Sequence, residues 1–263
     1  MPVAITRAIS RTLADCELSF VDREPIDIAL ARRQHRAYEE ALESLGCRVI
    51  SLPAEDELPD AVFVEDVAIV LDEIAIRTRP GAASRRGEVA SVAAALMPYR
   101  TLRVIEPPGT LDGGDVLCIG RTLYVGHSAR SNVSAIEQLR SLAGDAALDG
   151  RGYTVRPIPI RGCLHLKSAV TSVGEGTVLI NPSWVDRREF ANLRQITVDE
   201  NEPHAANALR IGNNVIYPAS FPRTAQRLAE AGIATKAVDT SELQKAEGAV
   251  TCCSLVFEAA PRS

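Results

Sequence analysis

The sequence predicts an α/β fold in which five similar units close into a ring around a common axis. Three observations predict it. Short polar strand starts recur five times along the 263 residues, and each is followed by an apolar run. Four of these runs have the pattern of a hairpin, and helix-like stretches separate the hairpins. The fifth unit is truncated at the C-terminus, and the N-terminal run 3–8 is suited to complete it, which removes an exposed sheet edge.

The strand starts set the period of the repeat. They are Glu65-Asp66, Gly114-Asp115, Lys167-Ser168, Ala206-Asn207 and Cys253-Ser254, and their second residues are separated by 49, 53, 39 and 47 positions. The hairpins expected after the first four starts span 67–78, 116–126, 169–181 and 208–217, with turn-forming residues between their strands. A ring with this period brings all five strand starts to one end, around the axis.

Helices are expected between the hairpins. Apolar spacing indicates them at 26–45, 85–96, 132–142, 187–194, 222–231 and 241–246. Ser84 is the predicted N-cap of the second helix, because its hydroxyl can accept a hydrogen bond from the first turn. No Pro-, Ser- or Gly-rich linker and no charge block divides the chain, so we expect a single domain over residues 1–263.

Composition argues against several classes of protein. The chain is 46% hydrophobic and 24% charged, as globular proteins are. Its net charge of −5 argues against a nucleic-acid-binding surface. No signal peptide is visible and no apolar run approaches the roughly 18 residues of a membrane helix. We therefore expect a cytoplasmic protein that binds neither membrane nor nucleic acid and keeps its six cysteines as free thiols.

A thiol and an imidazole are the first candidates for chemistry. The pair Cys252-Cys253 lies close to the C-terminus, and His165 stands in Leu164-His165-Leu166-Lys167. A thiol of pKa about 8.5 needs a nearby positive charge or base to act as a nucleophile. Taken alone, each has a simpler interpretation: two small buried hydrophobes, and a strand histidine with its hydrogen bonds satisfied. Cys163 and His165 share a strand face, but two ligands do not amount to a structural metal site.

Carboxylates and arginines complete the candidates. The carboxylates form two groups, Asp60, Glu65 and Asp66, then Asp112 and Asp115. Glu65 and Asp66 lie inside an apolar run, where carboxylates are costly unless paired, and a cationic ligand would pair them. Turn formation and helix capping are the alternative explanation. Arg85 and Arg130 lie near predicted helix starts, and their guanidinium forks suit a carboxylate.

Five motifs together resemble one known family. They are Phe63-Val64-Glu65-Asp66-Val67, Arg79-Pro80-Gly81-Ala82-Ala83-Ser84-Arg85-Arg86, Leu111-Asp112-Gly113-Gly114-Asp115-Val116, Leu164-His165-Leu166-Lys167-Ser168 and Thr251-Cys252-Cys253-Ser254. In this order, and over almost the whole chain, they resemble dimethylarginine dimethylaminohydrolase (dimethylargininase). That family belongs to the guanidino-group-modifying enzymes, or penteins. The resemblance thus implies a five-bladed α/β propeller of repeated ββαβ modules around a central axis.

The resemblance also implies a role for each site residue. It makes Cys252 the nucleophile, His165 the general acid and base, and Asp112 the acid beside it, where other members carry Glu. The implied substrate contacts are Glu65 and Asp66 at the guanidinium, Asp60 at the α-amino group, Arg85 and Arg130 at the α-carboxylate, and the backbone carbonyls of Leu18, in a mobile lid, and Ala246.

The activity that the resemblance implies is hydrolysis of Nω-methylated L-arginine. Asymmetric dimethylarginine or monomethylarginine would yield L-citrulline and dimethylamine or methylamine through a thiouronium on Cys252, with no metal or organic cofactor. The expected partner is the small-molecule substrate, and a homodimer stays open. Alternatives are arginine deiminase or amidinotransferase activity on the same scaffold, and a non-catalytic binder of arginine-like ligands. A papain-like protease fits poorly, because here the cysteine comes last.

Overall fold

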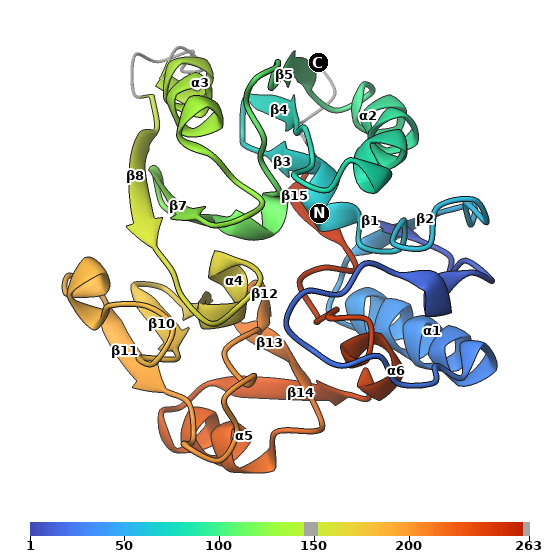
Figure 1. Ribbon diagram of the computed structural model, residues 1–263. Helices are drawn as coiled ribbons and strands as arrows, with labels where there is room; N and C mark the ends of the chain where they lie inside the picture. Colours follow the sequence, from blue (N-terminus) through green and yellow to red (C-terminus); the bar gives the residue numbers. More distant parts are fainter. Residues whose placement is uncertain (145–151, 260–263) are drawn as a thin grey trace.

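Five small sheets form a ring in this computed structural model, which describes residues 1–144 and 152–259. Figure 1 shows the sheets arranged around a common centre, with the longer helices on the outside of the ring. Each sheet has three strands. The predicted α/β ring of five units is confirmed.

Every sheet is built in the same way. Two neighbouring strands pair antiparallel, and a third strand pairs in parallel with the middle one. In four of the sheets the antiparallel pair is a hairpin. Four of the sheets consist of β3 (Ala68–Val70), β4 (Ile74–Arg77) and β5 (Thr101–Val104); β6 (Val116–Ile119), β7 (Thr122–His127) and β8 (Thr154–Pro159); β9 (Val170–Gly174), β10 (Thr177–Ile180) and β11 (Arg194–Thr197); and β12 (Leu209–Ile211), β13 (Asn214–Pro218) and β14 (Ala234–Val238). The four predicted hairpins are confirmed.

The fifth sheet joins the two ends of the chain. β15 (Leu255–Glu258) pairs antiparallel with β1 (Pro2–Arg7), and β1 pairs in parallel with β2 (Arg48–Leu52). β1 is buried along Val3–Arg7, because it lies in the middle of its sheet. The closure predicted for the run 3–8 is confirmed. It also places the loop before β15, which carries the cysteine pair, at the centre of the ring.

Four helices agree with the sequence prediction. They are α1 (Ile28–Ser44), α3 (Val133–Gly144), α5 (Pro222–Glu230) and α6 (Ser241–Gln244). The Asp27 side chain caps α1 by accepting a hydrogen bond from Leu30 N at 2.9 Å. Tyr38, on the buried face of α1, donates its hydroxyl hydrogen to Val250 O at 2.8 Å and thereby ties the helix to the C-terminal loop.

Two predicted helices are wrong in part. In the stretch 85–96, α2 spans only Val89–Leu96 and follows a 3₁₀ turn, η3 (Ser84–Glu88). Ser84 is not an N-cap, because its hydroxyl donates to Glu17 Oε1 at 2.6 Å instead. In the stretch 187–194, a 3₁₀ turn, η5 (Arg187–Phe190), replaces the helix, and Arg194 already belongs to β11, where it pairs with Thr177.

Short helical turns precede three of the inner strands. They are η2 (Val64–Val67) before β3, η4 (Gly113–Asp115) before β6, and α4 (Leu166–Ala169) before β9. η4 packs against both of the others. Apolar side chains fill the spaces between neighbouring sheets, so the polar turns gather at the axis. Within the described residues, no helix is long and apolar enough to cross a membrane.

Candidate active site

Hydrogen bonds tie the five strand starts together at the axis. Thr251 Oγ1 donates to Glu65 Oε2 at 2.7 Å, and Asn207 Nδ2 donates to Thr251 Oγ1 at 3.0 Å. Leu166 N donates to Asp115 Oδ1 at 2.9 Å. Residues far apart in the sequence thus become immediate neighbours, and the convergence predicted from the repeat is confirmed.

Two glycines allow the closest of these approaches. A Cβ on Gly114 would lie 2.5 Å from His165 Nδ1 and 2.8 Å from Asp66 Oδ1, and a Cβ on Gly113 would collide with the carbonyl oxygen of Glu65. Gly114 N donates to Asp66 Oδ1 at 3.0 Å. The Gly113-Gly114 step is therefore needed because side chains from other units pack directly against it.

A small pocket at the axis gathers most of the predicted site residues. Its volume is about 20 Å³. Seven of the ten predicted residues line it: Asp60, Asp66, Arg85, Arg130, His165, Ala246 and Cys252. Glu17, Phe63, Leu164 and Glu247 line it as well. Asp112, Glu65 and Leu18 are not in its wall, and each has a different location.

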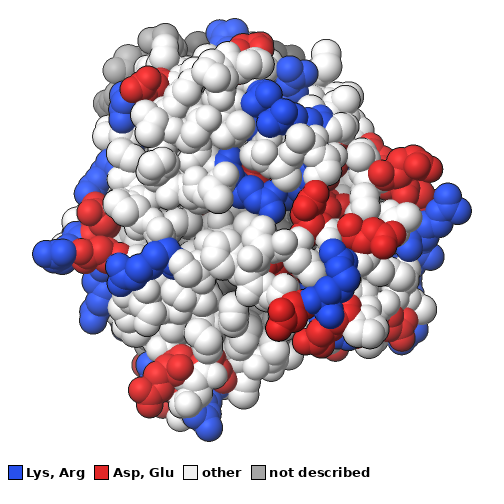
Figure 2. Space-filling view, in the orientation of Figure 1, with Lys and Arg blue, Asp and Glu red and all other residues white. Residues whose placement is uncertain are grey.

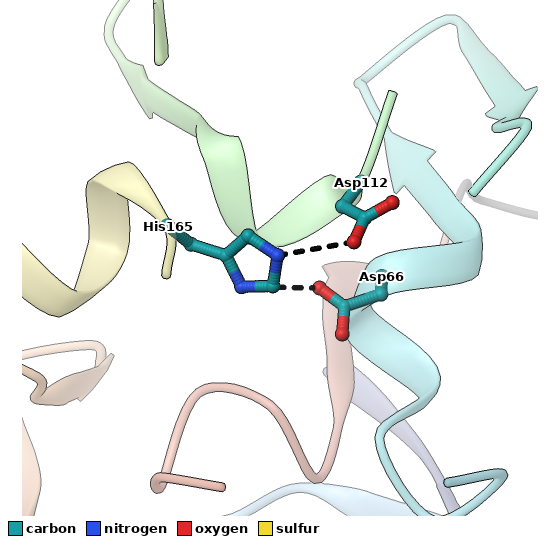
Figure 3. A group of neighbouring side chains, drawn as sticks. All are labelled: Asp66, Asp112 and His165. Carbon is teal, nitrogen blue, oxygen red and sulfur yellow. Dashed lines mark hydrogen bonds and ion pairs between the residues drawn. The ribbon is translucent and has the colours of Figure 1, made fainter. Parts of the chain in front are cut away.

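One edge of the His165 imidazole faces two carboxylates, those of Asp112 and Asp66, as Figure 3 shows. Its Nε2 is 3.1 Å from Asp112 Oδ2, and its Nδ1 is 3.7 Å from Asp66 Oδ1. All three residues are buried, and Asp112 is 0% exposed behind the imidazole. Asp112 Oδ1 also accepts a hydrogen bond from Gly81 N at 2.8 Å, which fixes the carboxylate. The Asp112–His165 pair therefore has the geometry expected of a proton carrier and its orienting acid.

Charge pairing keeps His165 protonated. Burial alone would lower the pKa of His165, but Asp66, the hydrogen bond to Asp112, and Asp115 outweigh it and raise the pKa to about 9. Burial would conversely raise the pKa of Asp66, yet His165 and Arg85 hold that pKa below its usual value. In the empty site the imidazolium is therefore present at neutral pH, ready to act as an acid.

Arg85 is fully engaged with the protein itself. Its Nη1 donates to Asp66 Oδ2 at 2.6 Å, and its Nη2 donates to Glu88 Oε2 at 2.8 Å and to Phe63 O at 3.2 Å. Only 4% of Arg85 is exposed. The structure brings Arg85 to the pocket, but as the centre of a buried ion-pair network. Glu88, three residues along η3, was missed by the sequence prediction, although the spacing Arg85-x-x-Glu88 is a signal for such a pair.

The two cysteines have different environments. Cys252 lines the pocket, and its carbonyl accepts a hydrogen bond from Glu65 N at 3.1 Å. Burial, together with the charges of Glu65 and Asp66, raises the pKa of the Cys252 thiol far above its usual range. Cys253 is 0% exposed and packs in the apolar cluster around α1, with its thiol directed to Ala249 O at 3.5 Å. The simple interpretation, a small buried hydrophobe, therefore applies to Cys253.

Glu65 and Asp66 face different cavities. Glu65 Oε1 pairs with Lys167 Nζ at 2.5 Å, and Glu65 lines a separate cavity of about 350 Å³ together with residues of the inner strands. Burial raises the pKa of Glu65, although Lys167 opposes the effect. Lys167 is a second residue that the sequence prediction missed, although it stands in the same motif as His165. Glu65 thus contacts the backbone of Cys252, while its side chain does not line the pocket.

Backbone contacts place the remaining predicted residues. Leu18 is half-buried and packs against the apolar cluster of α1, while its neighbour Glu17 lines the pocket. Glu17 N donates to Asp60 Oδ2 at 3.1 Å. Ala246 lies in the pocket wall, six residues before Cys252. Glu247, beside Ala246, is a further wall residue for which the sequence contains no distinctive motif.

Asp66, Asp112 and His165 also have a spacing that a metal ion could use, since one ligand atom of each lies within 4.8 Å of the others. A metal needs a neutral imidazole and would have to displace the His165 proton. The pKa of about 9 for His165 opposes that exchange at neutral pH. The arrangement is better described as a charge-paired imidazolium.

Sequence comparison matches the chain to one family model and to several curated relatives that share one name. The family model described as "N,N dimethylarginine dimethylhydrolase, eukaryotic" matches residues 19–256. A Streptomyces coelicolor N(G),N(G)-dimethylarginine dimethylaminohydrolase is 40% identical over 253 residues, covering 96% of this chain and 95% of that protein. The Pseudomonas aeruginosa protein of the same name is 35% identical over 255 residues, covering 96% and 98%.

Comparison of structures gives the same grouping. The Pseudomonas aeruginosa enzyme, solved as a cysteine-to-serine mutant with citrulline, superposes with a TM-score of 0.90 at 34% identity, covering 97% of this chain and 98% of that one. The N-terminal domain of the cyanobacterial arginine dihydrolase ArgZ has a TM-score of 0.86 at 20% identity, which shows the shared pentein fold alone. From these matches it follows that the chain belongs to the dimethylarginine dimethylaminohydrolase family.

Proposed function

We propose that this protein hydrolyses Nω-methylated L-arginine, releasing L-citrulline and dimethylamine or methylamine. One observation carries the proposal: Cys252 lines the same pocket as the His165 imidazolium and Asp66. A nucleophile, an acid and an anion that can bind a planar cation are thus present together. The solved Pseudomonas aeruginosa relative, which holds citrulline, supports the choice of product.

The substrate is held at both of its ends. Asp66, with Glu65 behind it, attracts the guanidinium, Asp60 binds the α-amino group, and the backbone carbonyls of Leu18 and Ala246 add acceptors. Arg130 and Arg85 bind the α-carboxylate. Arg85 reaches this role by exchanging one of its carboxylate partners, Asp66 or Glu88, for the carboxylate of the substrate. The guanidinium that arrives at Asp66 replaces the positive charge that Asp66 loses.

Substrate binding activates the thiol. In the empty pocket the carboxylates of Glu65 and Asp66 keep Cys252 protonated. The guanidinium brings a positive charge next to the sulfur, which lowers the thiol pKa, and the thiol proton leaves to solvent. The thiolate then attacks the central guanidinium carbon, which Asp66 holds in plane at close range.

His165 moves the protons of both steps. As the carbon–nitrogen bond breaks, the imidazolium gives its proton to the departing dimethylamine, and a thiouronium remains on Cys252. The now neutral imidazole takes a proton from water, which attacks the same carbon. As the carbon–sulfur bond breaks, the hydroxyl proton of the adduct passes to the sulfur, which restores the Cys252 thiol, and L-citrulline leaves. Asp112 keeps the imidazole oriented throughout and stabilises its charged form.

Paired variants and product analysis test the proposal. We expect purified protein to form citrulline and dimethylamine from asymmetric dimethylarginine, Cys252→Ser to abolish turnover, and Cys253→Ser to keep most of it. Equal loss in both variants means that the nucleophile is misassigned. If the protein prefers free arginine and releases ammonia from it, it is an arginine deiminase. Ligand binding without any turnover in the unmodified protein indicates a binder.

The proposal assigns residues 1–263 to one catalytic domain, since both ends of the chain meet in a single sheet. It places the enzyme in the cytoplasm, which is consistent with six free cysteines. Figure 2 shows acidic and basic side chains interspersed on one face, so the described residues form no continuous basic surface there for nucleic acid. A homodimer remains open and is tested by the mass of the protein in solution.

A further inference from the structure

Residues 17–27 belong to no helix or strand, and the first of them, Glu17, lines the pocket. Most of them are exposed, and Phe20 is 50% exposed. In Figure 1 the blue loop that precedes α1 reaches toward the middle of the ring, next to the red loop that precedes β15. An exposed, irregular segment has little burial to hold it, so a few polar contacts decide its position.

The pocket is closed in this arrangement. A volume of about 20 Å³ has room for about one water molecule. An arginine derivative is many times larger, so it reaches Cys252 only after part of the wall has moved. The 17–27 segment supplies Glu17 to that wall and is its least buried component. The contacts that hold the segment down therefore control access to the thiol.

Two of those contacts are single hydrogen bonds from pocket residues. Asp60 Oδ2 accepts from Glu17 N at 3.1 Å, and Arg130 Nη2 donates to Ser19 Oγ at 3.1 Å. Both partners are groups that the proposed substrate uses for its α-amino and α-carboxylate ends. These two contacts are therefore open to exchange when the substrate binds, and they cannot be the main attachment of the segment.

Glu247 makes the stronger attachment. Its carboxylate accepts hydrogen bonds from three consecutive backbone N–H groups: Ser19 N and Val21 N, each at 2.9 Å, and Phe20 N between them. Consecutive N–H groups that point inward form a concave site for an anion, and a carboxylate fills it with charge-assisted hydrogen bonds. No group of the proposed substrate has to displace Glu247, so this attachment can persist in the complex.

The backbone at Glu247 is built to aim this carboxylate. Glu247 has a φ of 56°, and in the described part of the chain it is the one non-glycine residue with a positive φ. Glu247 lies three residues after the end of α6. Glu242 in α6 and Lys245 directly after it hold the C-terminal end of the 17–27 segment. Glu242 Oε2 accepts from Asp27 N at 2.8 Å, and Lys245 Nζ donates to Pro25 O at 3.0 Å. Five residues of the segment thus hydrogen-bond to one short stretch, 242–247, which also leads to the nucleophile loop.

We propose that Glu247 is a latch: a positioning residue whose carboxylate holds the 17–27 segment closed over Cys252 by binding the backbone of residues 19–21. It touches neither the guanidinium nor the reacting atoms. When the three hydrogen bonds break, the segment lifts and the pocket opens. When they form again, Glu17 and Leu18 return to the bound ligand. The catalytic part of this inference rests on the proposed function, whereas the closure of the empty pocket does not.

Alkylation of the ligand-free protein tests the latch directly. Iodoacetamide labelling of each cysteine is followed by peptide mass spectrometry in the unmodified protein and in Glu247→Ala, Glu247→Gln and the exposed-turn control Glu175→Ala. We expect Cys252 to react about tenfold faster in Glu247→Ala and at an intermediate rate in Glu247→Gln, which keeps one acceptor oxygen. Exposed Cys118 and buried Cys47 should react at unchanged rates.

Two outcomes overturn the latch. An unchanged Cys252 rate in Glu247→Ala means that Glu247 does not hold the pocket closed. A parallel rise at Cys47 means that the variant has loosened the fold as a whole. Amide hydrogen exchange gives a second measurement on the same variants. The protection factors of the amides of residues 19–21 should fall about tenfold, while those of the amides in β1 should stay unchanged.

Kinetics separate positioning from chemistry. In Glu247→Ala we expect KM for asymmetric dimethylarginine to rise about tenfold and kcat to change less than about threefold, since the latch stabilises the closed complex and not the transition state alone. A fall in kcat at constant KM contradicts the latch. If the unmodified protein forms no citrulline while Cys252 still reacts faster in Glu247→Ala, the latch stands and the proposed function fails.

Discussion

Asp112 and Asp66 both interact with the His165 imidazole, and their charges determine whether His165 is protonated. With a pKa of about 9, His165 is an acid over the whole physiological range. The Cys252 thiol, with its raised pKa, needs the cation of the substrate to ionise. His165 therefore already carries the proton that the first chemical step requires, whereas Cys252 loses its proton only after the substrate has bound.

Substitution Asp112→Asn should move the basic limb of the pH profile. Asp112 is one of the groups that raise the pKa of His165, so its neutral replacement lowers that pKa toward the ordinary 6.5. Because the leaving amine needs a protonated His165, activity should disappear at a lower pH. We expect kcat/KM to fall about 10²-fold or more, and its basic limb to shift down by roughly one pH unit. A basic limb that stays in place contradicts the assignment of His165 as the acid.

Among the elements, η4 connects two parts of the site. Asp115 Oδ2 accepts hydrogen bonds from Ser128 Oγ and Ser131 Oγ, each at 2.6 Å, while Asp115 Oδ1 accepts from Leu166 N. Ser128 and Ser131 flank Arg130, and Leu166 follows His165. One buried carboxylate thus fixes the loop that carries Arg130 relative to the loop that carries His165.

Substitution Asp115→Asn should weaken this connection. The new NH₂ group has to face one of three donors, which leaves buried hydrogen bonds unmade. We expect the free energy of unfolding, measured by urea denaturation, to fall by about 2–4 kcal/mol. Ser128→Ala, which removes one of the two hydroxyl donors, should cost about 1 kcal/mol. Equal stability of Asp115→Asn and the unmodified protein contradicts this role for η4.

Prediction from sequence succeeded for those elements whose signal is local. Hairpins such as Val116–His127 were visible because apolar runs flank a glycine turn, and the strand starts were visible because polar residues interrupt those runs. The full network of Arg85 was not visible, since it joins Arg85 and Glu88 in η3 to Phe63 and Asp66 about twenty positions earlier. The contact of Glu247 with residues 19–21 spans more than 220 positions, and no local pattern announces it.

For the whole molecule, the ring concentrates charge at its axis, so folding and ionisation are linked. His165 has a folded-state pKa of about 9, above the ordinary 6.5 of the unfolded chain. Its contribution to stability is therefore complete below pH 6.5 and is lost as the pH rises through 9. A shift of this size corresponds to about 3 kcal/mol at most.

Urea denaturation at pH 6.5 and at pH 9 checks this linkage. The free energy of unfolding should decrease over this interval, and the decrease should be smaller in His165→Gln, which has no group to titrate. The difference between the two proteins isolates His165 from the other groups that ionise above pH 8. Identical slopes in both proteins contradict a raised pKa at the axis.

The central claim, that Cys252 carries the reaction as a covalent intermediate, is tested most directly by acid quenching during turnover. Tandem mass spectrometry of the peptide that contains both cysteines then locates the adduct. We predict a thiouronium adduct on Cys252 and none on Cys253, with the same mass from dimethylarginine and from monomethylarginine, because the methylated amine has already left. An adduct on Cys253, two different masses, or no adduct during active turnover contradicts the account.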